Sequence, residues 1–221
     1  MPRIVRVQAR DASGRINIGS GVTVAQDLIA TNCHVTRRAH SIELLIMTPY
    51  GPVPIPIVMQ ASSPGQDVCL LRTAVKLPMP PVGIGPGPRR GDAVVAIGFT
   101  GGINITMHAG EVLALHAYEG YNVIQSSTAF DSGASGGGLF TTDGRLVGLI
   151  TFRSRIGTPR FFSAPADWIK TVLEKQTFKP IAPNPSGRAF WEHAGAELPE
   201  FLQADMTVQS RSARFGSNDS E

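Results

Sequence analysis

The chain has 221 residues, a hydrophobic content of 42% and a formal net charge of +3. This length accommodates one sizeable domain or two small barrels packed as one unit. The arginines are scattered rather than interleaved with aromatic residues, which argues against nucleic-acid binding, and no apolar run approaches the roughly eighteen residues of a membrane span. Short apolar runs separated by turn residues extend over residues 3–163 without helical periodicity, so the predicted class is all-β.

The first segment with candidate chemistry is residues 19–35, which we interpret as two strands with His34 at the end of the second. Imidazole accepts and returns a proton near neutral pH, so His34 is a candidate general base. Asp67 opens the apolar strand 68–71, where a carboxylate requires a hydrogen-bond donor such as an imidazole N–H. Taken singly, His34 also fits a half-buried structural histidine and Asp67 fits a cap of the preceding turn.

Further strands are predicted at residues 42–47, 53–59, 93–98, 111–117 and 123–126. Between the second and third of these, the chain is rich in proline and glycine. Proline disfavours strand pairing, so this stretch is interpreted as the link between two barrels.

Residues 130–140 set Ser135 among glycines at the start of an apolar strand. A serine hydroxyl becomes an effective nucleophile when a base takes its proton and backbone N–H groups stabilise the oxyanion. The N–H groups of Gly133 and Ser135 are the candidates for that oxyanion hole. Alone, such a cluster is also typical of a flexible turn, but together with His34 and Asp67 it favours a catalytic triad.

One helix is predicted at residues 167–175, with apolar positions spaced for packing on the second barrel. Beyond it, residues 210–221 have the composition of a disordered tail, and a short helix near residues 190–193 or 199–204 is left open. The predicted organisation is an N-terminal barrel at 1–76 that carries His34 and Asp67, a linker at 77–90, a C-terminal barrel with one helix at 91–178, and a largely irregular or disordered extension at 179–221.

Several segments, taken in order, resemble the trypsin-like serine peptidases of the chymotrypsin fold, and among them the bacterial HtrA-type branch without its PDZ domain. These segments are residues 19–22, 30–35, 67–71, 91–98, 110–112 and 133–137. The resemblance covers about residues 17–175 and implies two packed antiparallel six-stranded β-barrels. It also implies a serine endopeptidase that forms an acyl-enzyme, with His34 as base, Asp67 as orienting carboxylate and Ser135 as nucleophile.

By the same resemblance, a polypeptide substrate would bind in extended form by strand addition. The residues that would contact it are Ala129, Phe130, Ser132, Thr151, Phe152 and Arg153. Thr151 also falls where such peptidases often place a hydroxyl against the catalytic aspartate. Ala129 brings no charge to the pocket, so cleavage is expected after small or medium apolar residues, although Phe130 or Asp131 could reshape the wall.

Three residues depart from the family's pattern. One is Gly138, which stands where proline or alanine is more usual. Ala134 stands where digestive enzymes carry an aspartate that pairs with a newly cut N-terminus, so activation by that ion pair is not expected. Arg153 stands where a small glycine often lines the substrate channel, and it would either narrow the site or favour an acidic substrate residue. The departures at Ala134 and Arg153 are the strongest support for an alternative function, a catalytically silent barrel that binds peptides or acts as a scaffold. The presence of all three triad residues argues against it.

Cys33 and Cys69 each lie within two residues of a triad candidate. Both are expected to be buried free thiols, with a disulfide as the alternative if the triad brings them together. Two cysteines without neighbouring ligands do not make a zinc site, and neither a metal nor a cofactor is expected.

A rival enzyme class is suggested by residues 133–137, which also satisfy the G-x-S-x-G pattern of α/β-hydrolase esterases. That class places acid and base after the serine, so Asp167 and His193 would have to serve, and it requires alternating strands and helices. The chain lacks that alternation.

No apolar signal region follows Met1, so the expected location is cytoplasmic unless a leader was removed. No membrane or nucleic-acid partner is expected. The HtrA resemblance leaves a homo-oligomer open.

Overall fold

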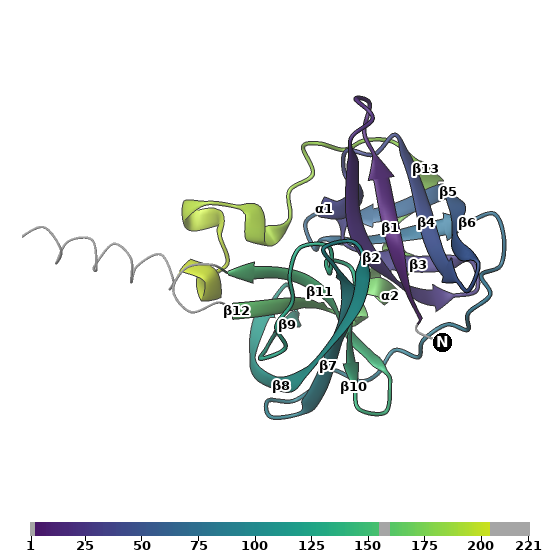
Figure 1. Cartoon of the computed structure of the whole chain (residues 1–221). Coiled ribbons are helices and arrows are strands. Elements are labelled where there is room, and N and C mark those ends of the chain that lie inside the picture. The colour runs from purple at the N-terminus through teal and green to yellow at the C-terminus, as the bar shows by residue number, and fades with distance from the viewer. Residues whose placement is uncertain (1–2, 155–159, 204–221) are drawn as a thin grey trace, which may run out of the picture.

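A computed structural model describes residues 3–154 and 160–203. The chain folds into two antiparallel barrels that lie side by side, with the nine-residue helix α2 (Asp167–Lys175) packed against them (Figure 1). The predicted all-β class, the pair of six-stranded barrels and the single long helix are confirmed. Within the described ranges, no helix has the length and apolarity needed to cross a lipid bilayer.

The first barrel closes where its fifth strand pairs with its sixth. Its elements are β1 (Ile4–Arg10), β2 (Ile16–Ala25), β3 (Leu28–Thr31), the one-turn helix α1 (Cys33–Thr36), β4 (Ser41–Thr48), β5 (Gly51–Ser63) and β6 (Val68–Thr73). Strand β1 shows how the sequence specifies this barrel. Successive side chains of a strand point to opposite faces, so Val5, Val7 and Ala9 are buried while Arg10 is exposed.

The second barrel is closed in the order β10-β11-β12-β9-β8-β7. Its strands are β7 (Ala93–Thr100), β8 (Asn104–Tyr118), β9 (Tyr121–Ser126), β10 (Gly138–Thr141), β11 (Leu146–Ser154) and β12 (Arg160–Pro165). The Pro-rich stretch before β7 runs along both barrels. Leu77, Met79 and Val82 are buried there, and the Val82 N–H donates to the Thr23 carbonyl at 2.9 Å.

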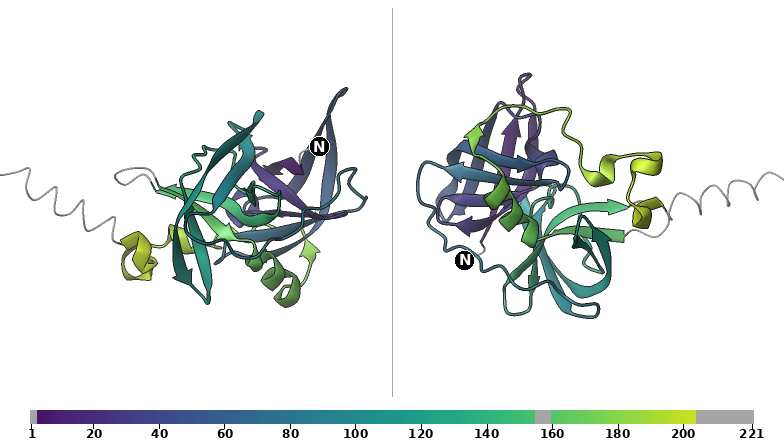
Figure 2. Two further views of the ribbon diagram at one scale, coloured as in Figure 1. Left: turned by 90° about the horizontal axis from the view of Figure 1, so that it is seen from below. Right: turned by 180° about the vertical axis from the view of Figure 1, so that it is seen from behind.

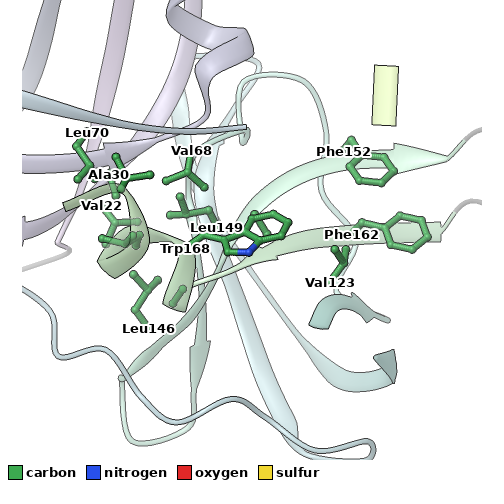
Figure 3. Close-up of a cluster of buried hydrophobic side chains, with 14 of the residues drawn as sticks. Val22, Ala30, Val68, Leu70, Val123, Leu146, Leu149, Phe152, Phe162 and Trp168 are labelled. Atoms are coloured by element: carbon green, nitrogen blue, oxygen red, sulfur yellow. The ribbon is translucent and has the colours of Figure 1, made fainter. Parts of the chain in front are cut away.

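A hydrophobic cluster joins the two barrels and helix α2 (Figure 3). Val22, Val68 and Leu70 come from the first barrel, Leu149 from the second, and Trp168 from the helix. All five are essentially inaccessible to solvent. Full burial of a large aliphatic or aromatic side chain stabilises a fold by about 1.5–3 kcal/mol, so this shared core holds the barrels in a fixed relative position.

The segment after α2 was predicted to be largely irregular or disordered, with a short helix left open near residues 190–193 or 199–204. Its described part, residues 179–203, consists of short elements separated by irregular stretches, and it lies against the barrels. It begins with β13 (Lys179–Pro180), which pairs with β5, and continues through the 3₁₀ helices η1 (Phe190–Glu192) and η2 (Gly195–Glu197) to a helical turn at residues 200–203. Figure 2 shows this strap running from the edge of the first barrel to the ends of β11 and β12.

Apolar anchors explain why the strap is ordered despite its proline and glycine content. Phe190, Leu198 and Leu202 are buried in the same cluster as Trp168. The overall composition of the segment predicts disorder, but these three buried side chains are enough to hold the strap against the barrels. The predicted disordered tail at residues 210–221 lies outside the described residues.

Candidate active site

His34 was predicted to lie at the end of a strand. The structure places it in the one-turn helix α1 instead. Strand β3 ends at Thr31, and the chain turns into the helix at Cys33. The first N–H groups of any helix lack partners within it. Asp67 accepts them, because its carbonyl receives the Cys33 N–H at 3.3 Å and its Oδ1 receives the His34 N–H at 2.8 Å. These two hydrogen bonds to Asp67 stabilise the turn of the chain into helix α1.

The Asp67 side chain is completely buried, and its carboxylate accepts hydrogen bonds from three donors. Besides the His34 N–H, these are His34 Nδ1 at 2.7 Å from Oδ2 and Trp191 Nε1 at 3.1 Å from Oδ2. A buried carboxylate is costly unless it is hydrogen-bonded, and here each oxygen is. Because the carboxylate oxygen accepts, Nδ1 of His34 carries the proton and Nε2 is left as an acceptor.

The loop around Ser135 depends on two glycines, one on each side of the serine. Gly133 has φ +91° and Gly136 has φ +83°, in the left-handed region that side chains disfavour. A Cβ at Gly136 would lie 2.2 Å from the Ser20 carbonyl oxygen, and one at Gly133 would lie 2.5 Å from the Phe99 carbonyl oxygen. Glycine is thus required at both positions for the loop to pack this closely.

Ser20, on β2 of the first barrel, holds the serine loop of the second. Its N–H donates to the Ser135 carbonyl at 2.8 Å, and its hydroxyl donates to the Gly133 carbonyl at 2.8 Å. Both carbonyls are thereby engaged. Among the described residues, the N–H groups of Gly133 and Ser135 donate to no acceptor.

His34 and Ser135 line one cleft of about 200 Å³. The other residues that line it are Phe130, Asp131, Ser132, Thr151, Phe152, Arg153 and Trp191. Five of the six predicted substrate contacts are among them; Ala129 is exposed and is not. The Ser135 hydroxyl donates to the Thr151 carbonyl at 3.3 Å.

The Thr151 hydroxyl was predicted to lie against the Asp67 carboxylate, but it bonds to other groups. It donates to the Leu149 carbonyl at 2.7 Å and accepts from the Ala164 N–H at 3.0 Å, at a bulge in the pairing of β11 with β12. It also accepts from Asn32 Nδ2 at 3.3 Å, and that amide donates to the Asp67 carbonyl at 2.9 Å. The indole N–H of Trp191 occupies that place at Asp67 instead.

The two charged side chains of the cleft pair with each other. Arg153 Nη2 lies 3.1 Å from Asp131 Oδ1. Arg153 was predicted either to narrow the site or to favour an acidic substrate residue. The ion pair with Asp131, another residue that lines the cleft, holds the Arg153 guanidinium in place and partly neutralises its charge.

Trp191 was missed by the sequence analysis, although adjacent aromatic residues in a Pro-rich segment were a usable signal. Its neighbour Glu192 accepts hydrogen bonds from Arg37 Nη1 and from the Ala189 N–H. Burial acts to raise the pKa of the Glu192 carboxyl, but these hydrogen bonds and the Arg37 charge outweigh it and hold that pKa below its ordinary value of 4.5. The ion pair therefore persists at neutral pH and fixes the strap beside the cleft.

Cys33 and Cys69 form a disulfide, so the expectation of free thiols is wrong. The pairing of β3 with β6 sets Thr31 opposite Cys69. Cys33 follows two residues later, where the chain turns into α1, and the two Cα atoms are 4.9 Å apart. This separation lies within the range that a disulfide spans.

The residues nominated for an esterase do not gather at Ser135. Asp167 accepts from Lys170 Nζ at 2.9 Å, and His193 Nδ1 lies 3.2 Å from Glu197 Oε2. Neither lines the cleft, and the two barrels differ from a doubly wound sheet. Nowhere in residues 3–154 and 160–203 do three or more His, Cys, Asp or Glu side chains form a group that could hold a metal ion.

Comparisons with known sequences agree with this geometry. Residues 19–149 match the family model described as the trypsin-like peptidase domain. The magnetosome formation protease MamE of Paramagnetospirillum magneticum is 33% identical over 144 residues, which are 61% of this chain and 20% of that protein. The mitochondrial serine protease HTRA2 of Bos taurus is 32% identical over 177 residues, 74% of this chain and 38% of that protein. The chain thus spans between a fifth and two fifths of these relatives' lengths.

Solved structures share the two-barrel fold. The active form of the Rv3671c protease from M. tuberculosis has a TM-score of 0.72 at 21% identity, with 85% of each chain covered. The serine endoprotease from Yersinia pestis has a TM-score of 0.68 at 28% identity, over 79% of this chain and 62% of that one.

Proposed function

Since this chain belongs to the trypsin-like peptidase family, of which the HtrA-type serine proteases are relatives, we propose that it hydrolyses peptide bonds through His34, Asp67 and Ser135. The observation that carries the proposal is the arrangement of donors and acceptors at the cleft. Asp67 holds the Nδ1–H of His34, which leaves Nε2 as an acceptor on the cleft that Ser135 also lines. Here the Ser135 hydroxyl donates to the Thr151 carbonyl. In such enzymes the hydrogen bond from the serine hydroxyl to the histidine commonly tightens only when substrate binds.

The proposed reaction proceeds in two balanced halves. His34 Nε2 takes the proton of Ser135 as the hydroxyl oxygen attacks the scissile carbonyl carbon, and the N–H groups of Gly133 and Ser135 bind the resulting oxyanion. The protonated imidazole then gives its proton to the departing amine, leaving an acyl-enzyme on Ser135. His34 then takes a proton from water as the water oxygen attacks the ester, and it returns that proton to the Ser135 oxygen as the acid is released.

An open strand edge supports binding of the polypeptide in extended form. Phe152 and Arg153 of β11 pair with β12, no described strand pairs with their other edge, and both residues line the cleft. An extended substrate would add to that edge through main-chain hydrogen bonds.

A fluorophosphonate probe tests the proposal. We expect a covalent adduct on Ser135 of the folded protein, mapped by mass spectrometry, because the activated serine attacks phosphorus as it would a carbonyl. Ser135→Ala should remove the adduct and His34→Ala should reduce it strongly. An unlabelled protein that still binds extended peptides would instead support the catalytically silent binder.

For substrate preference, we propose cleavage after small or medium apolar residues. Phe130 and Phe152 supply apolar walls, and the Asp131 carboxylate is already engaged by Arg153. A substrate Lys or Arg would have to displace Arg153 to reach it.

Matched peptides that differ only at the residue before the cleaved bond test this preference. We expect kcat/KM after Val or Leu to exceed that after Arg by about tenfold or more, the scale of discrimination by pocket contacts. Arg153→Met, which frees Asp131, should narrow that ratio by improving cleavage after Arg. Fastest cleavage after Arg by the unmodified protein would refute the preference.

A further inference from the structure

We propose that Trp191 is a positioning residue of the active site and that the strap, residues 179–203, therefore completes a site whose other parts lie in the barrels. The inference rests on the proposed function, because it concerns how the triad is held. It assigns a role to a segment that lies beyond the family match at residues 19–149.

Trp191 contacts two members of the proposed triad directly. Its Nε1 donates to Asp67 Oδ2 at 3.1 Å, the same oxygen that lies 2.7 Å from His34 Nδ1. Its ring also meets the His34 imidazole edge to face, with centroids 5.3 Å apart and an interplanar angle of 89°. One side chain thus restrains both the acceptor and the donor of the Asp67–His34 hydrogen bond.

A face of the indole packs against the second barrel. Trp191 stacks on Phe152 at 5.0 Å with an interplanar angle of 12°. Phe152 belongs to β11, whereas Asp67 and His34 belong to the first barrel. The indole therefore contacts both barrels. If the barrels moved apart, its contacts with Phe152 and with the Asp67 carboxylate could not both be kept.

The residues on either side of Trp191 are fixed, so the indole is positioned before substrate arrives. Phe190 is 1% exposed and packs against Trp168 and Tyr118, and its N–H donates to the Gly65 carbonyl at 2.9 Å. Glu192 pairs with Arg37, three residues after His34. Pre-organised neighbours of this kind reduce the reorganisation that catalysis requires.

A donor at Oδ2 has a specific consequence for the imidazole. Asp67 Oδ1 is held by the His34 backbone N–H, so the carboxylate plane is set by what Oδ2 binds. With Trp191 in place, Oδ2 is held from a second direction. Without it, only the mobile imidazole would restrain that oxygen, and His34 would sample orientations that point Nε2 away from Ser135.

Trp191→Phe in the full chain tests the role, because it keeps an aromatic ring on Phe152 and removes the N–H. Trp168→Phe is the matched control. Trp168 is buried in the core, and its Nε1 has no hydrogen-bond partner in the described part of the chain, so the same exchange there removes no bond. Each variant is compared with the unmodified protein for its rate of fluorophosphonate labelling at Ser135, for kcat and KM on one peptide, and for its melting temperature.

We expect Trp191→Phe to slow labelling and to lower kcat by about tenfold, the scale of one hydrogen bond to a charged group, with KM changed less than about twofold. Trp168→Phe should lower the melting temperature and leave the labelling rate of the folded protein within about twofold. The low-field proton resonance of the His34 Nδ1–H should shift in Trp191→Phe alone.

Two results would overturn the inference while leaving the peptidase intact. One is labelling of Trp191→Phe as fast as that of Trp168→Phe, which would make Trp191 a packing residue. The other is a rise in KM with an unchanged labelling rate, which would make it a substrate contact. Failure of the unmodified protein to label at Ser135 would instead count against the proposed function.

Discussion

The Asp67→Asn variant is expected to fold and to turn over substrate about 10⁴-fold more slowly than the unmodified protein. Asp67 is completely buried and accepts from two nitrogens of His34 and from Trp191. An asparagine amide would set an NH₂ group against one of these donors. To avoid that clash the imidazole must carry its proton on Nε2, where it cannot take the proton of Ser135.

Steady-state kinetics on a peptide, with circular dichroism to verify folding, measure this effect. Asp143→Asn is the control, because Asp143 lies in the exposed turn after β10 and pairs with Arg145. It should keep full activity. Less than a tenfold loss in Asp67→Asn would show that this carboxylate does not orient the base.

Loss of the disulfide should strongly reduce the stability of the fold. Replacing Cys33 and Cys69 together by serine is expected to lower the free energy of unfolding by about 3–4 kcal/mol, because the bridge closes a loop with a sequence separation of 36 and so restricts the unfolded chain. Urea unfolding under oxidising conditions measures it. Both serines would also bury hydroxyls in place of sulfur, which adds to the loss.

Reduction of the unmodified protein supplies the matched comparison. It should shift the urea midpoint in the same direction, and the double serine variant should not respond to reductant. Because Cys33 precedes His34 and Cys69 follows Asp67 by two residues, activity should fall in parallel. Equal urea midpoints for the oxidised and reduced forms would contradict the expected stabilisation.

The strands of both barrels could be predicted from sequence because their signal is local. In β4, which contains the predicted strand 42–47, the alternating residues Ile42, Leu44 and Ile46 are buried, and this alternation can be read directly from the sequence. The serine loop could be predicted for the same reason, since its glycines are neighbours of Ser135. The helix α2 also shows its apolar face within a single short window.

What escaped prediction depends on contacts between distant segments. The Cys33–Cys69 bond requires the register of β3 on β6. The place of the Thr151 hydroxyl depends on a bulge in the pairing of β11. Trp191 reaches Asp67 across 124 positions of sequence, and nothing near it indicates that partner. The adjacent aromatic residues Phe190 and Trp191 indicate that this segment packs on the core. They do not indicate that Trp191 donates a hydrogen bond to Asp67.

The bonds from Ser20 to the serine loop have a consequence for biosynthesis. Synthesis proceeds from the N-terminus, so β2, with Ser20, emerges from the ribosome long before Ser135, whose loop acquires its shape only when both barrels have met. A nascent or half-unfolded chain would expose the serine on a loose loop without its clamp. The serine loop of any one chain therefore gains its two bonds from Ser20 only after the first barrel has packed against the second.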